Sequence, residues 1–310
     1  MRVLLTGACG QLGQALRASV PKKISGKPLE LINTARCADK VNGLFELDLS
    51  NQDSCREAIK TWKPDWVLNV GAYTAVDKAE QQPALAHAVN ATAPRTLAVA
   101  MAEQSSQSRM LQISTDFVFS GLQGFPYLTD QALAPLNVYG ATKADGEKAV
   151  QEVLGSAMQG RATILRTSWV YGPVGSNFLR TMLKLHRQYS DSRQPLRVVA
   201  DQVGAPTSTL GLAEACWAVL EQEVSGILHW TDAGAASWYD FAVVIGEAAH
   251  SAGILDTVAQ VLPITTAEYP TPARRPAYSL LECSRSRKQL HLQAVHWQNA
   301  LKEVMHFVTA

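Results

Sequence analysis

The 310-residue chain has few of the features that mark metal sites, disulfide frameworks or membrane segments. Its five cysteines are odd in number and never fall in CxxC spacing, which predicts reduced thiols and a cytoplasmic location. The seven histidines form no HxxxH or HExxH pair, so we expect no structural or catalytic zinc. No apolar run is long enough to cross a bilayer, and the first residues are typical of a β-strand rather than of a signal peptide.

An excess of charge of one sign is also absent. The chain carries 28 Lys and Arg against 27 Asp and Glu, which gives a net charge of +1. This balance predicts neither a nucleic-acid-binding surface nor attachment to an anionic membrane. The 47% hydrophobic and 18% charged residues are typical of a globular protein of one or two domains.

What the chain does contain is a regular alternation of short apolar runs and longer helical patterns. The apolar runs predict strands at 2–6, 29–34, 44–50, 65–72 and 109–119, and a strand followed by a loop at 161–172. The helical patterns lie at 11–20, 51–62, 83–105 and 139–154. Ser50 is the expected N-cap of the second helix. This alternation predicts an α/β fold of the Rossmann type, a doubly wound parallel sheet with helices on both faces.

The pattern changes in the second half, where elements shorten and loops with Gly and Pro multiply. We expect residues 1–172 to form a dinucleotide-binding domain and residues 173–310 a smaller α/β lobe that binds the substrate. Some later segments would be free to return to the first sheet. A helix at 209–221 would be capped by Thr207 or Ser208.

Two motifs of the second half carry polar residues whose role the sequence leaves open. In DQVGAPTS, Asp201 and Gln202 would either face the cleft or only form a turn. In YPTPARRP, prolines stiffen the loop that carries Arg274 and Arg275. Two preorganised guanidinium groups suit a diphosphate. A subunit contact or a solvated loop is an equal alternative.

A glycine-rich turn, TGACGQLG, follows the first predicted strand and precedes the first predicted helix. Gly7 permits a tight turn, Gly10 lets the backbone approach a pyrophosphate, and Gly13 allows close packing of helix on strand. The helix N-terminus, at Gln11 and Leu12, would then bind phosphate. The motif predicts a nicotinamide dinucleotide site, and a turn that serves packing alone is the alternative.

Residues after the next three strands would contact the rest of the cofactor. Arg36 can meet a 2′-phosphate, which favours NADPH, while Asp39 nearby keeps NADH open. Asp48 and Leu49 would lie near the adenine. The residues expected to line the pyrophosphate and the nicotinamide ribose are Ala72, Tyr73 and Thr74.

Tyr139 and Lys143 lie four residues apart in a predicted helix, and therefore on one face of it. There the ammonium group would lower the pKa of the phenol from its ordinary value of about 10. Such a phenol is a proton donor for a carbonyl that is being reduced.

At the end of an earlier strand, Thr115 would hydrogen-bond the substrate oxygen. Capping of the next turn would also explain the presence of this residue.

These motifs, in this order, resemble the extended short-chain dehydrogenase/reductase superfamily. More narrowly, the chain resembles the dTDP-4-dehydrorhamnose reductase family. The segments that carry the resemblance extend along the whole chain and are TAVDKAE (74–80), STDFVF (114–119), PLNVYGATKADGEKA (135–149), RTSWVYG (166–172), NF (177–178), DQVGAPT (201–207), WYDFA (238–242) and YPTPARRP (269–276).

The resemblance implies an oxidoreductase of nucleotide-sugar and cell-surface polysaccharide synthesis. Its substrate would be dTDP-4-dehydro-L-rhamnose, whose C4 ketone is reduced. Tyr139 would donate the proton and Lys143 would hold the nicotinamide ribose. Thr115 and Asp116 would orient the carbonyl. Trp169 would cover the apolar face of the sugar, with core packing as the alternative.

Two departures from the family pattern qualify what it implies, and a third position separates the chain from dehydratases. Gln14 and Ala15 stand where metal-linked dimers of the family carry a glutamate. A bridging Mg²⁺ is therefore doubtful, and monomer and homodimer both stay open. Cys9 lies in the glycine turn, where it would be close to the cofactor. Phe117 follows the Thr-Asp pair where dehydratases carry a glutamate, which disfavours dehydration.

Two other functions stay open on the sequence alone. One is an epimerase that recycles tightly held NAD⁺. The other is a non-catalytic subunit similar to the regulatory β subunit of methionine adenosyltransferase. Because Tyr139, Lys143 and Thr115 are all present, the sequence shows no sign of lost catalysis.

Overall fold

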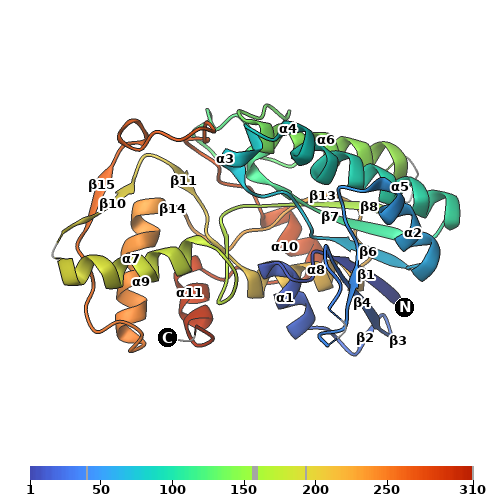
Figure 1. Cartoon of the computed structure of the whole chain (residues 1–310), viewed down its shortest axis with the longest axis horizontal. Coiled ribbons are helices and arrows are strands. Elements are labelled where there is room, and N and C mark those ends of the chain that lie inside the picture. The colour runs from blue at the N-terminus through green and yellow to red at the C-terminus, as the bar shows by residue number, and fades with distance from the viewer. Residues whose placement is uncertain (40, 156–159, 193, 309–310) are drawn as a thin grey trace.

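A parallel seven-stranded sheet forms the centre of the larger part of the protein. The computed structural model describes residues 1–39, 41–155, 160–192 and 194–308. The strands, in the order in which they lie in the sheet, are β13 (Gly226–His229), β8 (Ala162–Thr167), β7 (Arg109–Thr115), β6 (Trp66–Asn69), β1 (Arg2–Thr6), β4 (Glu30–Ala35) and β5 (Leu44–Glu46). The order reverses between β1 and β6, the position at which such sheets bind ligands. The predicted Rossmann-type fold is confirmed (Figure 1).

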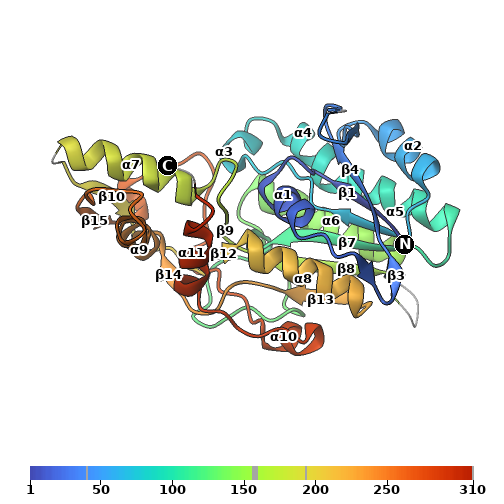
Figure 2. The ribbon, with the colours of Figure 1, turned by 90° about the horizontal axis from the view of Figure 1, so that it is seen from below.

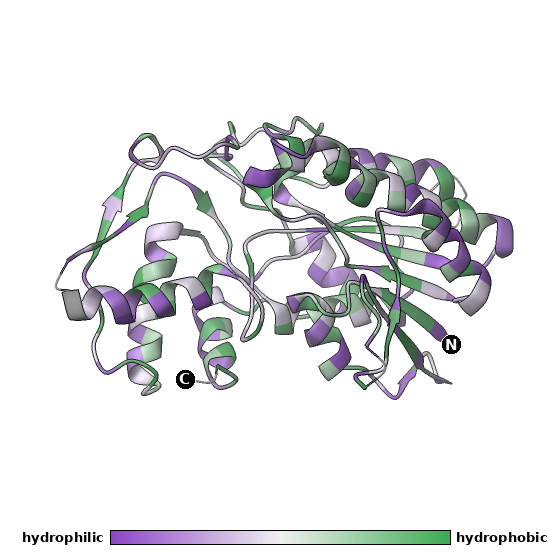
Figure 3. Ribbon diagram, viewed as in Figure 1, coloured by the Kyte–Doolittle hydropathy of each residue, from purple (hydrophilic) through white to green (hydrophobic). Residues whose placement is uncertain are grey.

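Helices cover both faces of this sheet (Figure 2). The helices on one face, whose apolar residues share a core cluster with the strands, are α2 (Gln52–Trp62), α5 (Ala93–Gln104) and α6 (Val138–Leu154). Those on the other face are α1 (Gln11–Ala18) and α8 (Thr209–Glu221), with α10 (Ser284–Leu290) beside them. Figure 3 shows mostly hydrophobic strands and hydrophilic residues along the helices. Burial of the apolar strands between two helical layers therefore drives the fold.

Short elements lie between the strands and helices of the larger part. They are β2 (Lys23–Ile24), β3 (Lys27–Pro28), α3 (Val76–Ala79), α4 (Pro83–His87), a π-helical segment (Ala88–Thr92) and a 3₁₀ turn (Asp116–Val118). The predicted helix 83–105 is therefore interrupted by the π-helical segment, a feature that often occurs at functional sites.

The smaller lobe packs around a core cluster of its own. Its main elements are α7 (Phe178–Ser192), β10 (Leu196–Val199), α9 (Trp238–Ser251), β15 (Val261–Ile264) and α11 (Trp297–Met305). Short strands and one 3₁₀ turn complete it, namely β9 (Val170–Tyr171), β11 (Val203–Gly204), β12 (Thr207–Ser208), β14 (Ala236–Ser237) and Thr266–Glu268. Although β13 and α8 come from the second half of the sequence, they lie in the larger part. The functional division at residue 172 stays a prediction.

Some predicted boundaries were wrong for local reasons. The strand expected at 109–119 ends at Thr115, because the Thr115 side chain accepts a hydrogen bond from the Phe117 amide and starts a 3₁₀ turn. The N-cap of α2 is Asn51, whose side chain accepts from two amides of the first turn. Ser50 instead donates its hydroxyl to Asp48.

Other local predictions agree with the structure. Ser208, one of two expected caps of α8, accepts a hydrogen bond from the amide of Gly211. Across the described ranges of the chain, no helix is both long enough and apolar enough to span a membrane.

Candidate active site

The glycine turn after β1 has the close backbone approaches that a dinucleotide site requires. Gly7 has a φ of +65°, and a Cβ there would lie 2.6 Å from the Cα of Gly71. A Cβ on Gly13 would lie 2.3 Å from the carbonyl oxygen of Gly7. Neither position admits a side chain, because both neighbouring atoms belong to the backbone. The turn is held in its shape by the first and third glycines of the motif.

Helix α1 begins at this turn with unsatisfied amides. Its N-cap, Gly10, is exposed and makes no side-chain cap, so the first-turn amides of Gln11 and Leu12 have no intrahelical acceptor. The Leu12 side chain is buried. The Gln11 side chain donates to the Val170 carbonyl at 3.2 Å and accepts from Asn177 at 3.1 Å. Gln11 and Leu12 thus offer their backbone amides to a ligand, and the turn fits a pyrophosphate.

The predicted partners of the adenosine half lie at the ends of β4 and β5. Arg36 is exposed directly after β4, whereas the Asp39 carboxylate is engaged by Asn42. Asp48 accepts from the amide and hydroxyl of Ser50, so it shapes the turn before α2. The arrangement leaves Arg36 with an exposed guanidinium beside the turn, while Asp39 and Asp48 serve local structure.

The segment after β6 lies against the glycine turn. A Cβ on Gly71 would be 2.6 Å from Cδ1 of Leu49, which places Leu49 against Gly71. Ala72 and Tyr73 are half-buried here and Thr74 is exposed. The three residues therefore follow the turn along the sheet edge.

Asn90, in the π-helical segment Ala88–Thr92, connects the residues after β6 to α6, the helix that carries Tyr139. Its buried side chain accepts from the amide of Tyr73 at 2.8 Å and donates to the Tyr73 carbonyl at 3.0 Å. It also donates to the Thr142 hydroxyl, which in turn donates to the Tyr139 carbonyl at 2.9 Å. Sequence reasoning missed Asn90, because the predicted helix 83–105 gave no sign of the π-helical interruption in which Asn90 lies.

Tyr139, Thr115 and Asp116 come together at the carboxyl end of β7. Burial raises the pKa of Tyr139 to about 12, hydrogen bonding to Thr115 opposes this shift, and the Asp116 charge adds to it. Thr115 donates to the Asp116 carboxylate at 3.0 Å. Burial also raises the pKa of Asp116 to about 6. The phenol is therefore protonated at neutral pH and touches the predicted carbonyl-orienting hydroxyl.

Lys143 lies one turn further along α6 and is buried, with 3% of its surface exposed. Its Nζ donates to the Ile113 carbonyl at 2.6 Å. Burial lowers the pKa of Lys143 to about 8, and the nearby Glu147 charge opposes the shift. The predicted lowering of the phenol pKa was wrong, because burial of Tyr139 raises that pKa and the Lys143 charge is not among the causes of its shift.

A chain of buried polar side chains joins the glycine turn to Lys143. Thr6 accepts from the Gly71 amide at 3.0 Å and donates to Asn69 at 2.6 Å. Asn69 donates to Gln112, which donates to the same Ile113 carbonyl that receives Lys143. These contacts run across β1, β6 and β7 and hold the dinucleotide turn and Lys143 in a fixed relation.

Trp169, the predicted sugar contact, lies after β8 with a φ of +47° and is stacked on Trp238. The ring centroids are 3.6 Å apart and the planes differ by 7°. One face of Trp169 is therefore covered by α9, so packing explains part of its placement. A sugar would have to use the other face or an edge.

A cavity of about 750 Å³ begins at Trp238 and extends between α7 and β10 of the smaller lobe. Gln202 and Arg275 line it. Asp201 does not line it, and accepts instead from the amide and hydroxyl of Thr266. Gln202 thus faces a cavity, one of the two alternatives for the DQVGAPTS motif, while Asp201 braces a neighbouring turn.

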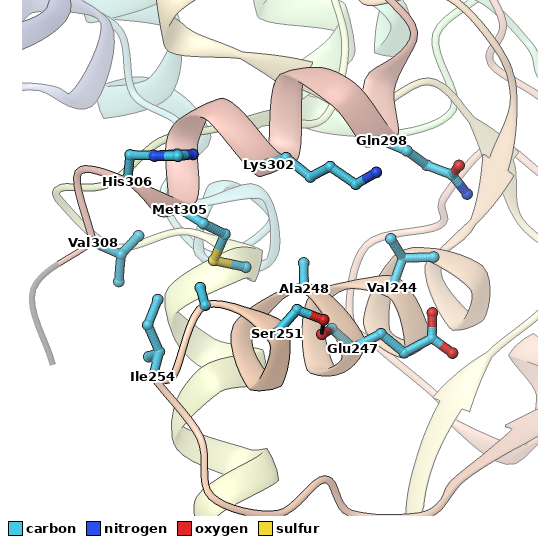
Figure 4. A pocket seen from close by; sticks show the side chains of 11 residues that line it. Val244, Glu247, Ala248, Ser251, Ile254, Gln298, Lys302, Met305, His306 and Val308 are labelled. Carbon is cyan, nitrogen blue, oxygen red and sulfur yellow. Dashed lines mark hydrogen bonds between the residues drawn. The ribbon is translucent and has the colours of Figure 1, made fainter.

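A second hollow, of about 740 Å³, lies between α9 and α11 (Figure 4). Glu247 and Lys302 project from the two helices over apolar residues such as Val244 and Met305. None of the predicted site residues lines this hollow. It is therefore not a candidate for the reduction.

No group of His, Cys, Asp and Glu side chains suited to a metal ion occurs among the described residues. Gln14, at the position where a bridging glutamate would stand, donates to the Cys9 carbonyl at 2.8 Å. Metal independence stays a prediction.

Known proteins resemble this chain over its full length. A model of the family described as "RmlD substrate binding domain" matches residues 1–309. A dTDP-4-dehydrorhamnose reductase of Aggregatibacter actinomycetemcomitans is 36% identical, with 98% of each chain covered. The chain belongs to the dTDP-4-dehydrorhamnose reductase family. The predicted family is confirmed, and membership makes the protein an oxidoreductase.

Two solved structures of the dTDP-4-dehydrorhamnose reductase family match in both sequence and fold. The Clostridium acetobutylicum protein is 36% identical, covers 99% of each chain and has a TM-score of 0.84. The Bacillus anthracis protein, a complex with NADP, is 31% identical, covers 98% of each chain and has a TM-score of 0.82. Coverage of this extent includes the smaller lobe as well as the dinucleotide-binding sheet.

Proposed function

We propose that this protein reduces the C4 ketone of dTDP-4-dehydro-L-rhamnose to give dTDP-L-rhamnose, with NADPH as the preferred cofactor and NADH as the alternative. The observation that carries the proposal is the meeting of Tyr139 and Thr115 at the carboxyl end of β7. Lys143 is fixed beside them and is connected through buried polar groups to the glycine turn. Family membership supports the choice of sugar.

The bound cofactor supplies the hydride, and the protein's residues supply position and a proton. When the sugar is bound, Thr115 turns its one hydroxyl proton from Asp116 to the ketone oxygen, and this hydrogen bond becomes stronger as negative charge develops on that oxygen. The Tyr139 phenol, protonated because its pKa is about 12, gives its proton to the new alkoxide. The Lys143 ammonium holds the ribose next to the phenol. The Phe117 ring packs edge-on against the Tyr139 ring, with their centroids 5.7 Å apart, and offers no second acid or base.

Other properties follow from the same proposal. We place the reaction in the cytoplasm, with a dTDP-sugar as the small-molecule partner and no nucleic acid. The enzyme works as a monomer or homodimer. Arg36, exposed after β4, supports the NADPH preference.

The direct test follows the absorbance of the reduced nicotinamide when protein, NADPH and dTDP-4-dehydro-L-rhamnose are mixed. Tyr139→Phe should lower kcat by about two orders of magnitude or more, with little change in KM. Tyr239→Phe, a matched change on α9, should leave kcat unaltered. Absence of turnover in the natural protein, together with tight binding to another protein, would favour the regulatory-subunit function.

A further inference from the structure

The loop formed by residues 269–276 connects the smaller lobe to the part of the molecule that carries Tyr139. It begins after β15 and passes over the top of the view in Figure 1 toward α3. Three of its residues, Tyr269, Thr271 and Arg275, line the cavity of about 750 Å³. The loop thus borders the cavity while reaching the dinucleotide-binding half.

Asp77, on α3, holds this loop through a two-pronged ion pair with Arg275. Its Oδ1 and Oδ2 accept from Nη1 at 3.1 Å and from Nη2 at 2.8 Å. The same carboxylate accepts from the amide of Ala273 at 3.1 Å. The hydrogen bond from Arg275 lowers the pKa of Asp77. A planar guanidinium paired in this way fixes orientation as well as distance.

The loop is also bonded to the N-terminus of α6, next to Tyr139. Asn137, the N-cap of α6, donates through Nδ2 to the Arg274 carbonyl at 2.8 Å. Its Oδ1 accepts from the amide of Gly140 at 2.8 Å. From α3, Glu80 accepts from the amide of Val138 at 2.9 Å. The first turn of the Tyr139 helix is therefore attached both to α3 and to the loop.

The hydrogen-bonding groups of Arg275 point to a positioning role rather than to direct binding of an anion. Nη1 donates to Thr271 and to the Ala273 carbonyl in addition to Asp77. Nη2 donates to the other oxygen of Asp77. Both terminal nitrogens of Arg275 thus donate to acceptors within the protein, and the Asp77 carboxylate neutralises its charge.

We propose that Asp77, Arg275 and Asn137 form a clasp that fixes the cavity loop 269–276 against the first turn of α6. The clasp sets the position of the Tyr139 phenol relative to a substrate that extends from Tyr139 toward the cavity, because the cavity lining includes loop residues but neither Tyr139 nor Thr115. Asp77 and Arg275 are positioning residues, since neither donates to the reacting atoms. The inference rests on the proposed reduction of a dTDP-sugar, because it requires this sugar to contact the face of loop 269–276 that lines the cavity.

The test compares Asp77→Asn, which keeps size but removes the charge, with the natural protein. Arg95→Gln is the control, because Arg95 pairs with Glu152 near the other end of α6 and both are exposed. We expect Asp77→Asn to lower kcat/KM for the sugar by about tenfold to a hundredfold, since small displacements of a reacting group have effects of this size. KM for NADPH should stay within about twofold, because the glycine turn is untouched.

Hydrogen exchange supplies a readout that needs no turnover. In Asp77→Asn, amides of residues 270–277 and of 138–142 should both exchange faster, while amides of 93–104 should not change. A merely structural ion pair would loosen 270–277 alone, and faster exchange confined to that segment would overturn the clasp. If Asp77→Asn does not fold, Arg275→Lys takes its place, because a lysine cannot pair through two nitrogens.

The outcomes separate the two proposals. An active natural protein with an equally active Asp77→Asn variant would refute the clasp and leave the reductase function intact. An inactive natural protein would refute the proposed function, and the exchange data alone would then decide whether the loop and the first turn of α6 are coupled.

Discussion

The Nζ of Lys143 donates a hydrogen bond to the carbonyl oxygen of Ile113, two residues before the strand ends in Thr115. The distance is 2.6 Å, and the lysine is buried between α6 and β7. Burial lowers the pKa of Lys143 and raises that of Tyr139, so the two groups lose their protons in the order lysine, then tyrosine. Burial is thus the main determinant of the pKa values of this pair.

The pH dependence of the rate should follow Lys143. Its ammonium form is present below a pKa of about 8 and is lost as the pH rises through that value, so kcat/KM should fall there. The Tyr139 proton, with a pKa of about 12, stays in place over this range. A profile of kcat/KM against pH checks this. A Lys143→Arg variant, whose side chain stays charged, should lack the decline, and a flat profile for the natural protein would contradict the role of Lys143.

Gly13→Ala should abolish tight binding of the cofactor. The added methyl group would lie 2.3 Å from the Gly7 carbonyl oxygen and 2.7 Å from the Ala8 Cα, so the backbone of the turn must move. We expect NADPH affinity, measured by quenching of protein fluorescence, to fall by about tenfold or more. Gly124→Ala is the control, because nothing lies within 4 Å of its added Cβ. Equal affinity in both variants would remove the turn from the cofactor site.

Arg36→Ala should change cofactor preference rather than turnover. A lost charge-assisted hydrogen bond to a 2′-phosphate costs about 1.5–3 kcal/mol, roughly a tenfold to hundredfold rise in KM for NADPH. KM for NADH should stay within about twofold, because NADH lacks that phosphate. Arg56→Ala, an exposed change on α2, is the control. Parallel changes in both KM values would argue against contact with a 2′-phosphate.

Glu147→Gln should destabilise the protein strongly. Glu147 and Arg166 are 1% and 2% exposed, and Arg166 donates to the carboxylate through Nε and Nη2. Removing one charge leaves the other buried without its partner, at a cost of about 3–5 kcal/mol in the free energy of unfolding. Urea unfolding measures the loss. Glu152→Gln, which breaks an exposed pair, should cost no more than about 1 kcal/mol, and similar losses in both would contradict the expectation.

Much of the site was predictable because it is local in the chain. The glycine turn lies within a few residues of β1, and the four-residue spacing of Tyr139 and Lys143 needs only a helix to bring them together. The family pattern then connects these motifs to a nucleotide-sugar reductase. Alternation of apolar strands and helices was sufficient for the sheet, although strand ends depended on side-chain caps such as that of Thr115.

Contacts between distant segments could not be read from spacing. Asn137 meets the Arg274 carbonyl across 137 positions, and Asp77 meets Arg275 across 198. The stack of Trp169 on Trp238 likewise depends on how α9 packs. The hydrophobic periodicity of one segment does not specify which surface of a distant segment it will contact in the folded protein.

The amino-acid sequence by itself determined the parallel sheet, the dinucleotide turn and the residues that can donate a proton, because each follows from local conformation and side-chain chemistry. Tertiary structure alone decided the protonation order of Tyr139 and Lys143 and the attachment of loop 269–276 to the first turn of α6. The physical reason is that desolvation and long-range hydrogen bonding depend on which groups exclude water from one another, and that is fixed only when the chain has folded.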